Sequence, residues 1–266
     1  MSRNEYIPFL SEITEIIKHT DIEYTFRMSY SGQVNPGQFF EVSIPKFGEA
    51  PISVSGIGAD FIDLTIRRVG KVTNEIFEQY AGGSLYLRGP YGNGFCTDSF
   101  RGKELAVIAG GTGLSPVRGV IEHFWENPQE LKKMKLIAGF RSPEDILFRN
   151  DISRWSSRID VTLTVDSLEK DYEVFYNTGL VTEYIPEIGF EDNSEACAVA
   201  VGPPAMMHFT VLALLKAGFK KENIWISYER RMCCGIGKCG RCKISDKYVC
   251  LDGPVFNYSE AASLID

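Results

Sequence analysis

Four cysteines late in the chain have the spacing of an iron–sulfur ligand set. Cys234, Cys239, Cys242 and Cys250 are separated by four, two and seven residues. The first three reproduce the plant-type [2Fe–2S] spacing, in which a fourth thiolate arrives further along the chain. Because such a cluster transfers one electron at a time, the spacing predicts a protein that takes electrons from one molecule and gives them to another.

Other uses of these cysteines stay open from the spacing alone. Zinc ligands usually come as two close pairs with a longer gap, and a disulfide framework suits a short secreted chain. The interleaved glycines favour a cluster, because Gly235, Gly237 and Gly240 let backbone N–H groups approach anionic sulfides. Cys233, beside the first ligand, is expected to be a packed thiol. Three basic residues nearby would help to hold an anionic cluster: Lys238, Arg241 and Lys243.

Length and composition describe an ordinary globular protein. The 266 residues leave room for two modest domains and a small appendage. A net charge of −7 argues against nucleic-acid binding as the main role. No apolar run approaches the ~18 residues of a membrane span, and the first twenty residues mix charges among apolar positions, unlike a signal peptide. Seven cysteines fit a metal site in a reducing cytoplasm, where we expect the protein to lie.

The first hundred residues predict β-structure. Short apolar or alternating segments occur at 22–28, 39–44 and 61–69, and glycine- and proline-containing turns separate them. Several short strands at such intervals are typical of a small antiparallel barrel. We therefore assign residues 1–100 to a β-barrel domain.

From residue 101 the pattern changes to alternating strands and helices, which predicts a parallel α/β sheet. Strand-like runs lie at 105–109, 135–140, 161–165 and 196–201, and helical periodicity lies at 116–125 and 206–215. We assign residues 101–226 to an α/β nucleotide-binding domain and residues 227–266 to a small cluster module.

Two glycine-containing turns follow predicted strands. The first glycine turn, Gly110–Gly113, leads from a buried strand towards Pro116, which suits a first helical turn. The second glycine turn is Gly202–Pro204. Glycines let a phosphate approach the backbone, and a helix N-terminus supplies N–H donors. Because ligands bind at the carboxyl ends of parallel strands, the two turns together predict a nucleotide site.

Four blocks, followed by the cysteine motif, resemble the ferredoxin–NADP reductase superfamily. They are residues 50–55, residues 67–73, residues 89–95 and the two glycine turns. More narrowly, the chain resembles a branch that ends in a [2Fe–2S] module. That branch includes the dihydroorotate dehydrogenase electron-transfer subunit, the sulfhydrogenase gamma subunit and the corresponding subunit of anaerobic sulfite reductase, which the C-terminal sequence resembles most.

The resemblance implies three bound groups: FAD, NADH (or NADPH) and the cluster held by the four cysteines. It implies no catalytic acid or base. The superfamily usually has arginine at Ala50 and an aromatic residue at Ile52, so the flavin phosphates would depend more on Arg67 and the loop after it. The implied cofactor-binding residues are Pro51, Ser53, Val54, Arg67, Val69, Gly70, Lys71, Val72, Thr73, Gly110, Gly111, Thr112, Gly113, Gly202 and Pro203.

These implications predict an electron-transfer subunit. Electrons would pass from NAD(P)H through FAD to the cluster, and then to an iron–sulfur partner subunit, expected to be that of an anaerobic sulfite reductase. Within redox chemistry, the alternatives are dihydroorotate dehydrogenase and a sulfhydrogenase. From a different class, the alternative is a zinc-bearing, nucleotide-binding scaffold without turnover.

Overall fold

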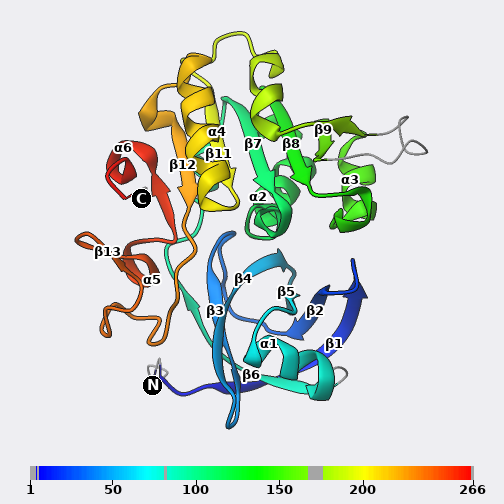
Figure 1. Cartoon of the computed structure of the whole chain (residues 1–266), viewed down its shortest axis with the longest axis vertical. Coiled ribbons are helices and arrows are strands. Elements are labelled where there is room, and N and C mark those ends of the chain that lie inside the picture. The colour runs from blue at the N-terminus through cyan, green and yellow to red at the C-terminus, as the bar shows by residue number, and fades with distance from the viewer. Residues whose placement is uncertain (1–3, 5, 81–82, 167–175, 265–266) are drawn as a thin grey trace. The chain divides into compact units, whose positions relative to one another are not determined.

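The structure of the protein, a computed structural model, describes residues 4, 6–80, 83–166 and 176–264 (Figure 1). It divides into two compact units. Unit 1 comprises Met1–Phe95 and Glu229–Val255, and unit 2 comprises Cys96–Tyr228 and Phe256–Asp266. The sequence assigned to the cluster module is thus shared between the units, and the three-domain description stays a prediction.

Unit 1 contains the predicted antiparallel barrel, which closes in the strand order β1-β2-β5-β4-β3-β6. Alternate side chains of each strand point inward, and the interior includes the fully buried Phe26, Phe40 and Leu87. The strands are β1 (Phe9–Lys18), β2 (Glu23–Ser29), β3 (Phe39–Ile44), β4 (Gly48–Ile57), β5 (Phe61–Arg67) and β6 (Ser84–Tyr91).

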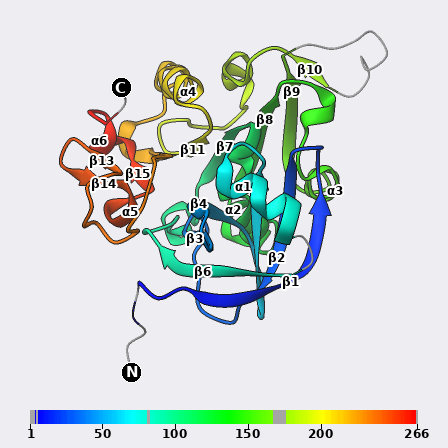
Figure 2. The same ribbon diagram turned by 60° about the horizontal axis from the view of Figure 1, so that its bottom comes forward.

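Two further segments complete unit 1. Helix α1 (Lys71–Glu75) follows β5 and continues into a π-helical turn, Ile76–Tyr80. The cysteine-rich segment has little regular structure, as Figure 2 shows in orange. Its elements are β13 (Lys243–Ile244), β14 (Lys247–Tyr248) and α5 (Val249–Asp252).

Unit 2 is built on the predicted α/β sheet, with the order β10-β9-β8-β7-β11-β12-β15. The strand pairs from β10 to β12 are parallel. The strands are β7 (Glu104–Gly110), β8 (Lys133–Phe140), β9 (Asp160–Val165), β10 (Asn177–Thr178), β11 (Cys197–Val201), β12 (Ile224–Ser227) and β15 (Val255–Asn257). Val255, the first residue of β15, is counted in unit 1. The α-helices are α2 (Leu114–Glu126), α3 (Arg149–Trp155), α4 (Pro204–Lys216) and α6 (Tyr258–Ala261).

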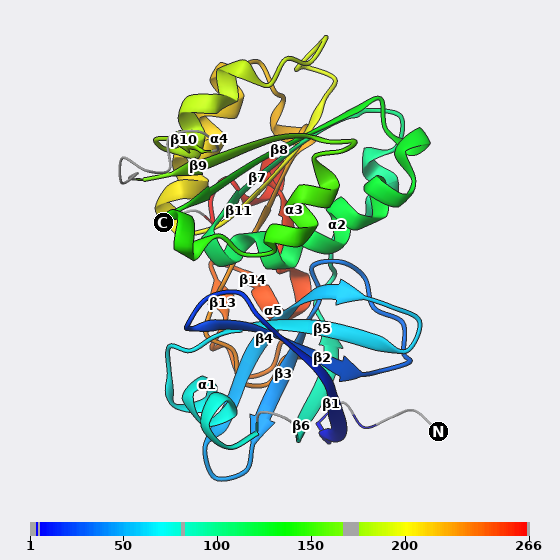
Figure 3. The same ribbon diagram turned by 90° about the vertical axis from the view of Figure 1, so that its right-hand side faces the viewer.

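The strand order explains where the two glycine turns lie. From β7 the chain crosses to β8 on one side, and from β11 it crosses to β12 on the other. Right-handed crossovers in opposite directions put α2 and α4 on opposite faces of the sheet, as Figure 3 shows. The neighbours β7 and β11 therefore mark the point where the order reverses, beyond whose carboxyl ends such sheets bind ligands. Both glycine turns begin there.

Candidate functional site

The cysteine loop, defined as residues 233–250, directs backbone donors at two of the predicted ligand sulfurs. The N–H of Gly237 donates to Sγ of Cys250 at 3.1 Å. The N–H groups of Lys238 and Cys239 donate to Sγ of Cys234 at 3.3 and 3.4 Å. Backbone donors of this kind stabilise anionic sulfur. The local donor set thus fits thiolate ligands of an iron–sulfur cluster.

The two sulfurs differ in their electrostatic surroundings. Burial opposes ionisation of Cys234, but N–H donors from residues 236, 238 and 239 outweigh burial and lower its pKa to about 6. Burial raises the pKa of Cys250 to about 12, and the neighbouring Cys242 thiol adds to that increase. Cys242 and Cys250 are buried, whereas Cys239 is exposed. In the part of the chain that the structure describes, no three His, Cys, Asp or Glu side chains meet around one metal-ion position.

The expectation that Cys233 is a packed thiol is wrong, because its side chain is exposed. The backbone of this residue, rather than its thiol, is held in place: its carbonyl oxygen accepts a hydrogen bond from Arg88 at 2.5 Å. The thiol is therefore separate from the contact that fixes the residue.

The block at residues 89–95 has a role that sequence reasoning missed. The Asn93 side chain donates to the carbonyl oxygens of Asp252 and Val255 at 3.0 and 2.8 Å, and it accepts from the Val255 N–H at 3.3 Å. The backbone N–H of Asn93 also donates to the Gly253 carbonyl at 2.7 Å. The turn after β6 thus holds the segment that follows the last predicted ligand.

A buried acidic residue, Glu41, lies on the strand next to β6. Glu41 is fully buried on β3 and neither of its carboxyl oxygens has a hydrogen-bond partner among the described residues. It pairs in register with Arg88 of β6, so the two side chains share one face of the barrel wall. Burial raises the pKa of Glu41 to about 7, although the positive charge of Arg88 opposes this shift. The sequence signal for it was a glutamate flanked by Phe40 and Val42.

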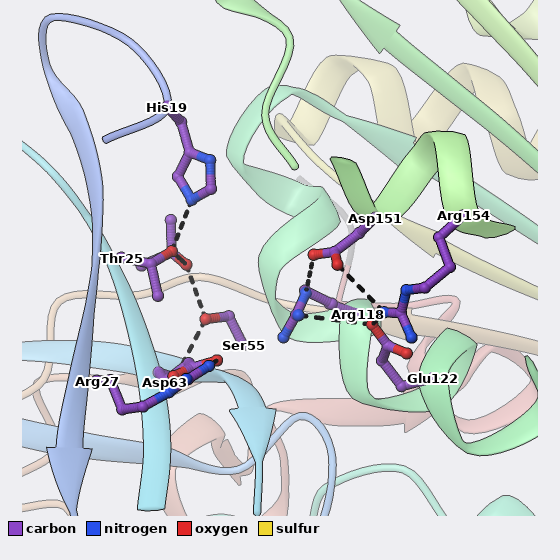
Figure 4. A network of polar contacts seen from close by, with 10 residues as sticks. His19, Thr25, Arg27, Ser55, Asp63, Arg118, Glu122, Asp151 and Arg154 are labelled. Carbon is purple, nitrogen blue, oxygen red and sulfur yellow. Dashed lines mark hydrogen bonds and ion pairs between the residues drawn. The ribbon is translucent and has the colours of Figure 1, made fainter. Parts of the chain in front are cut away.

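The predicted flavin-ring residues lie along β4. Pro51 and Ser53 are half-buried, and Val54 is buried, with its N–H bonded to the Gln38 carbonyl at 2.9 Å. On the same strand, Ser55 ends a series of polar side chains that starts at His19 and passes through Thr25 and Thr65. The series connects three barrel strands with successive distances of 2.7 Å (Figure 4). This series fixes the wall on which the predicted ring-contacting residues sit.

The predicted phosphate loop, residues 67–73, lies largely at the surface. Residues 67–71 are all exposed, and a side chain added at Gly70 would meet no atom within 4 Å. Arg67 pairs through Nε with Glu23 at 3.2 Å, while 44 % of its side-chain surface stays accessible. The Thr73 hydroxyl accepts the N–H groups of Val69 and Gly70, each at 3.0 Å, which folds the loop onto the start of α1. This open loop with a tethered arginine fits a phosphate-bearing ligand.

The two glycine turns touch each other in unit 2. A side chain at Gly113 would come within 2.4 Å of the Val201 carbonyl oxygen and 2.9 Å of the Gly202 Cα atom. An added side chain at Gly110 would meet the Met206 sulfur at 2.2 Å, a contact with a flexible side chain rather than with backbone. Gly111, by contrast, has φ +54° and faces open space, where an added side chain would meet nothing within 4 Å. Gly113 thus lets the two turns pack closely, and Gly111 leaves bare backbone of the kind that nucleotide phosphates approach.

Charged side chains fix α3 beside α2 in the same unit. Arg118 Nε donates to Asp151 at 2.8 Å, and Arg154 contacts both Glu122 and Asp151 (Figure 4). These charged groups pair with one another, so their role is to hold the two helices together.

Comparison with known proteins shows the family to which the chain belongs. The oxidoreductase NAD-binding domain matches residues 107–211, and the iron–sulfur cluster binding domain of dihydroorotate dehydrogenase B matches residues 229–261. Sulfhydrogenase 2 subunit gamma of Pyrococcus furiosus is 35 % identical over 284 aligned positions, which cover 98 % of each chain. The chain belongs to the same family. A further relative, the probable dihydroorotate dehydrogenase B electron transfer subunit of that organism, is 33 % identical over 93 % of this chain and 88 % of the relative.

Solved structures agree on the fold of this family. The NADH-dependent reduced ferredoxin–NADP oxidoreductase structure covers 100 % of this chain and 94 % of its own, with a TM-score of 0.76 and 22 % identity. The ferredoxin reductase of carbazole 1,9a-dioxygenase covers 83 % of this chain and 68 % of its own, with a TM-score of 0.71 and 24 % identity. The predicted superfamily fold is therefore confirmed. No helix among the described residues has the length and apolar character that crossing a membrane requires.

Proposed function

We propose that the chain is the NAD(P)H-oxidising electron-transfer subunit of a multi-subunit, cytoplasmic enzyme. Electrons pass from NAD(P)H through FAD to a [2Fe–2S] cluster held by the thiolates of Cys234, Cys239, Cys242 and Cys250, and then to a partner subunit. One observation carries the proposal. The segment that matches an iron–sulfur binding domain is also the segment in which three backbone N–H groups are directed at cysteine sulfurs.

The glycine turns would bind the nicotinamide nucleotide. Gly110, Gly113 and Gly202 keep side chains away from the ends of β7 and β11, while Gly111 leaves its backbone open to a phosphate. Thr112 and Pro203 complete the two turns. The match of residues 107–211 with an NAD-binding domain supports this assignment.

Unit 1 would bind FAD along β4 and the loop after β5. Pro51, Ser53 and Val54 would contact the ring, and Arg67, with the loop Val69–Thr73, would contact the phosphates. The exposed loop and the accessible Arg67 guanidinium support this role. When bound, FAD accepts an electron pair as hydride and releases electrons singly, which reconciles a nicotinamide donor with a one-electron cluster.

The proposal also concerns which enzyme complex the partner subunit belongs to. The relatives are subunits of a sulfhydrogenase and of dihydroorotate dehydrogenase B. They favour the alternatives raised by the sequence over its sulfite reductase reading. A cavity of about 570 Å³ beside the cysteine loop offers a place for a partner to approach, since Lys238, Cys250 and the 58 % exposed Leu251 line it. Purification of the native complex, followed by identification of the partner chain, decides among a sulfhydrogenase, a dihydroorotate dehydrogenase and a sulfite reductase.

The experiment that tests the function is anaerobic purification with measurement of flavin, iron and NADH-dependent reduction of an artificial acceptor. We expect one flavin, two irons and turnover. The double variant Cys239→Ala, Cys242→Ala should lose the iron, whereas Cys233→Ser, with its exposed thiol, should keep it. A colourless protein that contains zinc would support the scaffold alternative, and iron retained by the double variant would contradict the ligand assignment.

A further inference from the structure

Arg88 of β6 connects the barrel to the start of the cysteine loop inside unit 1. Its Nη1 donates to the carbonyl oxygen of Cys234 at 2.7 Å, and its Nη2 donates to that of Cys233 at 2.5 Å. The two partners lie 146 and 145 residues further along the chain. The guanidinium therefore joins the first predicted cluster ligand to a strand that is fixed in the barrel wall.

Every donor of this guanidinium is used. An arginine carries five N–H groups in a fixed fork. Besides the two carbonyls, Nε and Nη2 donate to the Glu49 carboxylate at 2.9 and 2.6 Å, and Nη1 donates to the Tyr91 hydroxyl at 3.0 Å. The Arg88 side chain is only 5 % exposed. A buried, fully paired fork of this kind fixes the positions of its acceptors, and a lysine, with three donors on a flexible stem, cannot replace it.

The position of the Cys234 carbonyl determines the course of the next residues. Gly235, with φ +75°, lies so close to the Tyr91 ring that an added side chain would come within 2.7 Å of it. The backbone then turns back, so that the N–H groups of Lys238 and Cys239 meet the Cys234 sulfur. Arg88 and Tyr91 thus set the direction in which the loop leaves the barrel and, through it, the place of the first ligand.

We propose that Arg88, oriented by Glu49, is a positioning residue for the iron–sulfur cluster. The inference rests on the proposed binding of the cluster by Cys234 and its three partners. Arg88 acts through the peptide groups of residues 233 and 234 and does not ligate iron. Removal of hydrogen bonds that orient metal ligands lowers metal affinity or activity by roughly 10- to 100-fold.

The competing explanation is that Arg88 only stabilises the barrel. The chain offers a matched control in Arg27, which forms the same two-point contact with Asp63, through Nε at 2.8 Å and Nη2 at 3.2 Å, between β2 and β5 of the same barrel. Substitution of either arginine by lysine weakens a barrel ion pair, but only Arg88→Lys also releases the cysteine loop.

The experiment uses anaerobically purified holoprotein of the wild type, Arg88→Lys, Glu49→Gln and Arg27→Lys. Three readouts are taken: iron per chain, the half-life of the cluster absorbance in excess chelator, and the electron paramagnetic resonance line shape after dithionite reduction. We expect a half-life about 10-fold shorter and an altered line shape for Arg88→Lys, a smaller change in the same direction for Glu49→Gln, and wild-type values for Arg27→Lys.

Each contrary result has a distinct meaning. A wild-type protein without iron overturns the proposed function itself. A wild-type protein with its cluster, together with an unchanged half-life and line shape in Arg88→Lys, overturns the positioning role of Arg88. Equal loss in Arg27→Lys also overturns it, because barrel stability then explains the effect. If Arg88→Lys does not fold, a wild-type half-life and line shape in folded Glu49→Gln overturn the role.

Discussion

Glycines occur in both the first glycine turn and the cysteine loop, but the backbone around them differs. Gly113 has an ordinary helical φ of −61° and no room for a side chain. Gly240 has φ +76° and open space around it. Gly113 must therefore be glycine because two strands and their turns approach closely, whereas glycine is favoured at position 240 because the chain bends there in a left-handed conformation. The same residue type meets a packing constraint at Gly113 and a conformational constraint at Gly240.

The two regions also differ in what supports them. Backbone atoms of Val201 and Gly202 lie against Gly113. The cysteine loop is held by side chains, Arg88 at its start and Asn93 just after its end. Backbone packing has no charge, whereas the side-chain supports include ionisable groups. Substitution and pH should therefore separate the regions.

The largest effect is expected for Gly113→Ala. The new methyl group would lie within 2.4 Å of a backbone oxygen that cannot move without breaking the β7–β11 pairing. We expect a loss of about 3 kcal/mol of unfolding free energy or more, measured by denaturant titration. Gly111→Ala, with open space but φ +54°, is the matched control and should cost about 1 kcal/mol. Equal costs would contradict the packing argument.

The second prediction is a pH effect on stability, of similar or smaller size, that arises from Glu41, the neighbour of Arg88 in the barrel. The pKa of Glu41 is raised from 4.5 to about 7, so the folded state keeps a proton that the unfolded state releases in this range. The contribution of Glu41 to stability should therefore fall as pH rises from about 4.5 to 7 and level off above it. Glu41→Gln does not titrate, so its stability relative to wild type should increase over this window by on the order of 2–3 kcal/mol.

Unfolding free energies of both proteins at pH 5 and pH 8 check this expectation. The matched control is Glu12→Gln, which changes an exposed glutamate on β1 of the same barrel and is measured at the same two pH values. A constant difference between Glu41→Gln and wild type across the window would show that Glu41 is ionised in the folded protein.

The smallest effect is expected for Gly240→Ala. No atom obstructs the new side chain, so the cost is only that of a non-glycine residue at φ +76°, about 1 kcal/mol. Gly240→Asn should recover part of this loss, because asparagine tolerates the left-handed region better than alanine. Melting temperatures of the three holoproteins measure the series. A larger loss for asparagine than for alanine would mean that space, rather than conformation, is limiting there.

Local patterns predicted much of the fold. The segments 39–44 and 105–109 correspond to β3 and the centre of β7, and the glycine turns led to the reversal point of the sheet. The spacing of the cysteines selected a segment that matches an iron–sulfur domain. These features could be predicted because they depend on residues close together in the sequence and on the order of the strands. Periodicity and short motifs in the sequence reveal both.

The supports of the cysteine loop could not be predicted in the same way. Arg88 meets Cys234 across 146 residues, and Asn93 meets Val255 across 162. No periodicity connects such positions. Glu41 resembles a solvent-facing strand residue in the sequence, but it is buried on the barrel face that also carries Arg88, the residue bonded to the cysteine loop. The error over Cys233 has the same origin, since its backbone, and not its thiol, makes the contact with Arg88.

The central claim is that nicotinamide electrons reach a cluster held by the cysteine loop. The most direct measurement is the electron paramagnetic resonance spectrum of anaerobic holoprotein mixed with NADH and with NADPH, with dithionite reduction as the reference. We predict that at least one of the two nucleotides produces the signal of a reduced [2Fe–2S] cluster in the wild type, and that this signal is absent from the Cys239→Ala, Cys242→Ala variant. A cluster that dithionite reduces but neither nucleotide reduces, in a protein with its flavin bound, would contradict the claim.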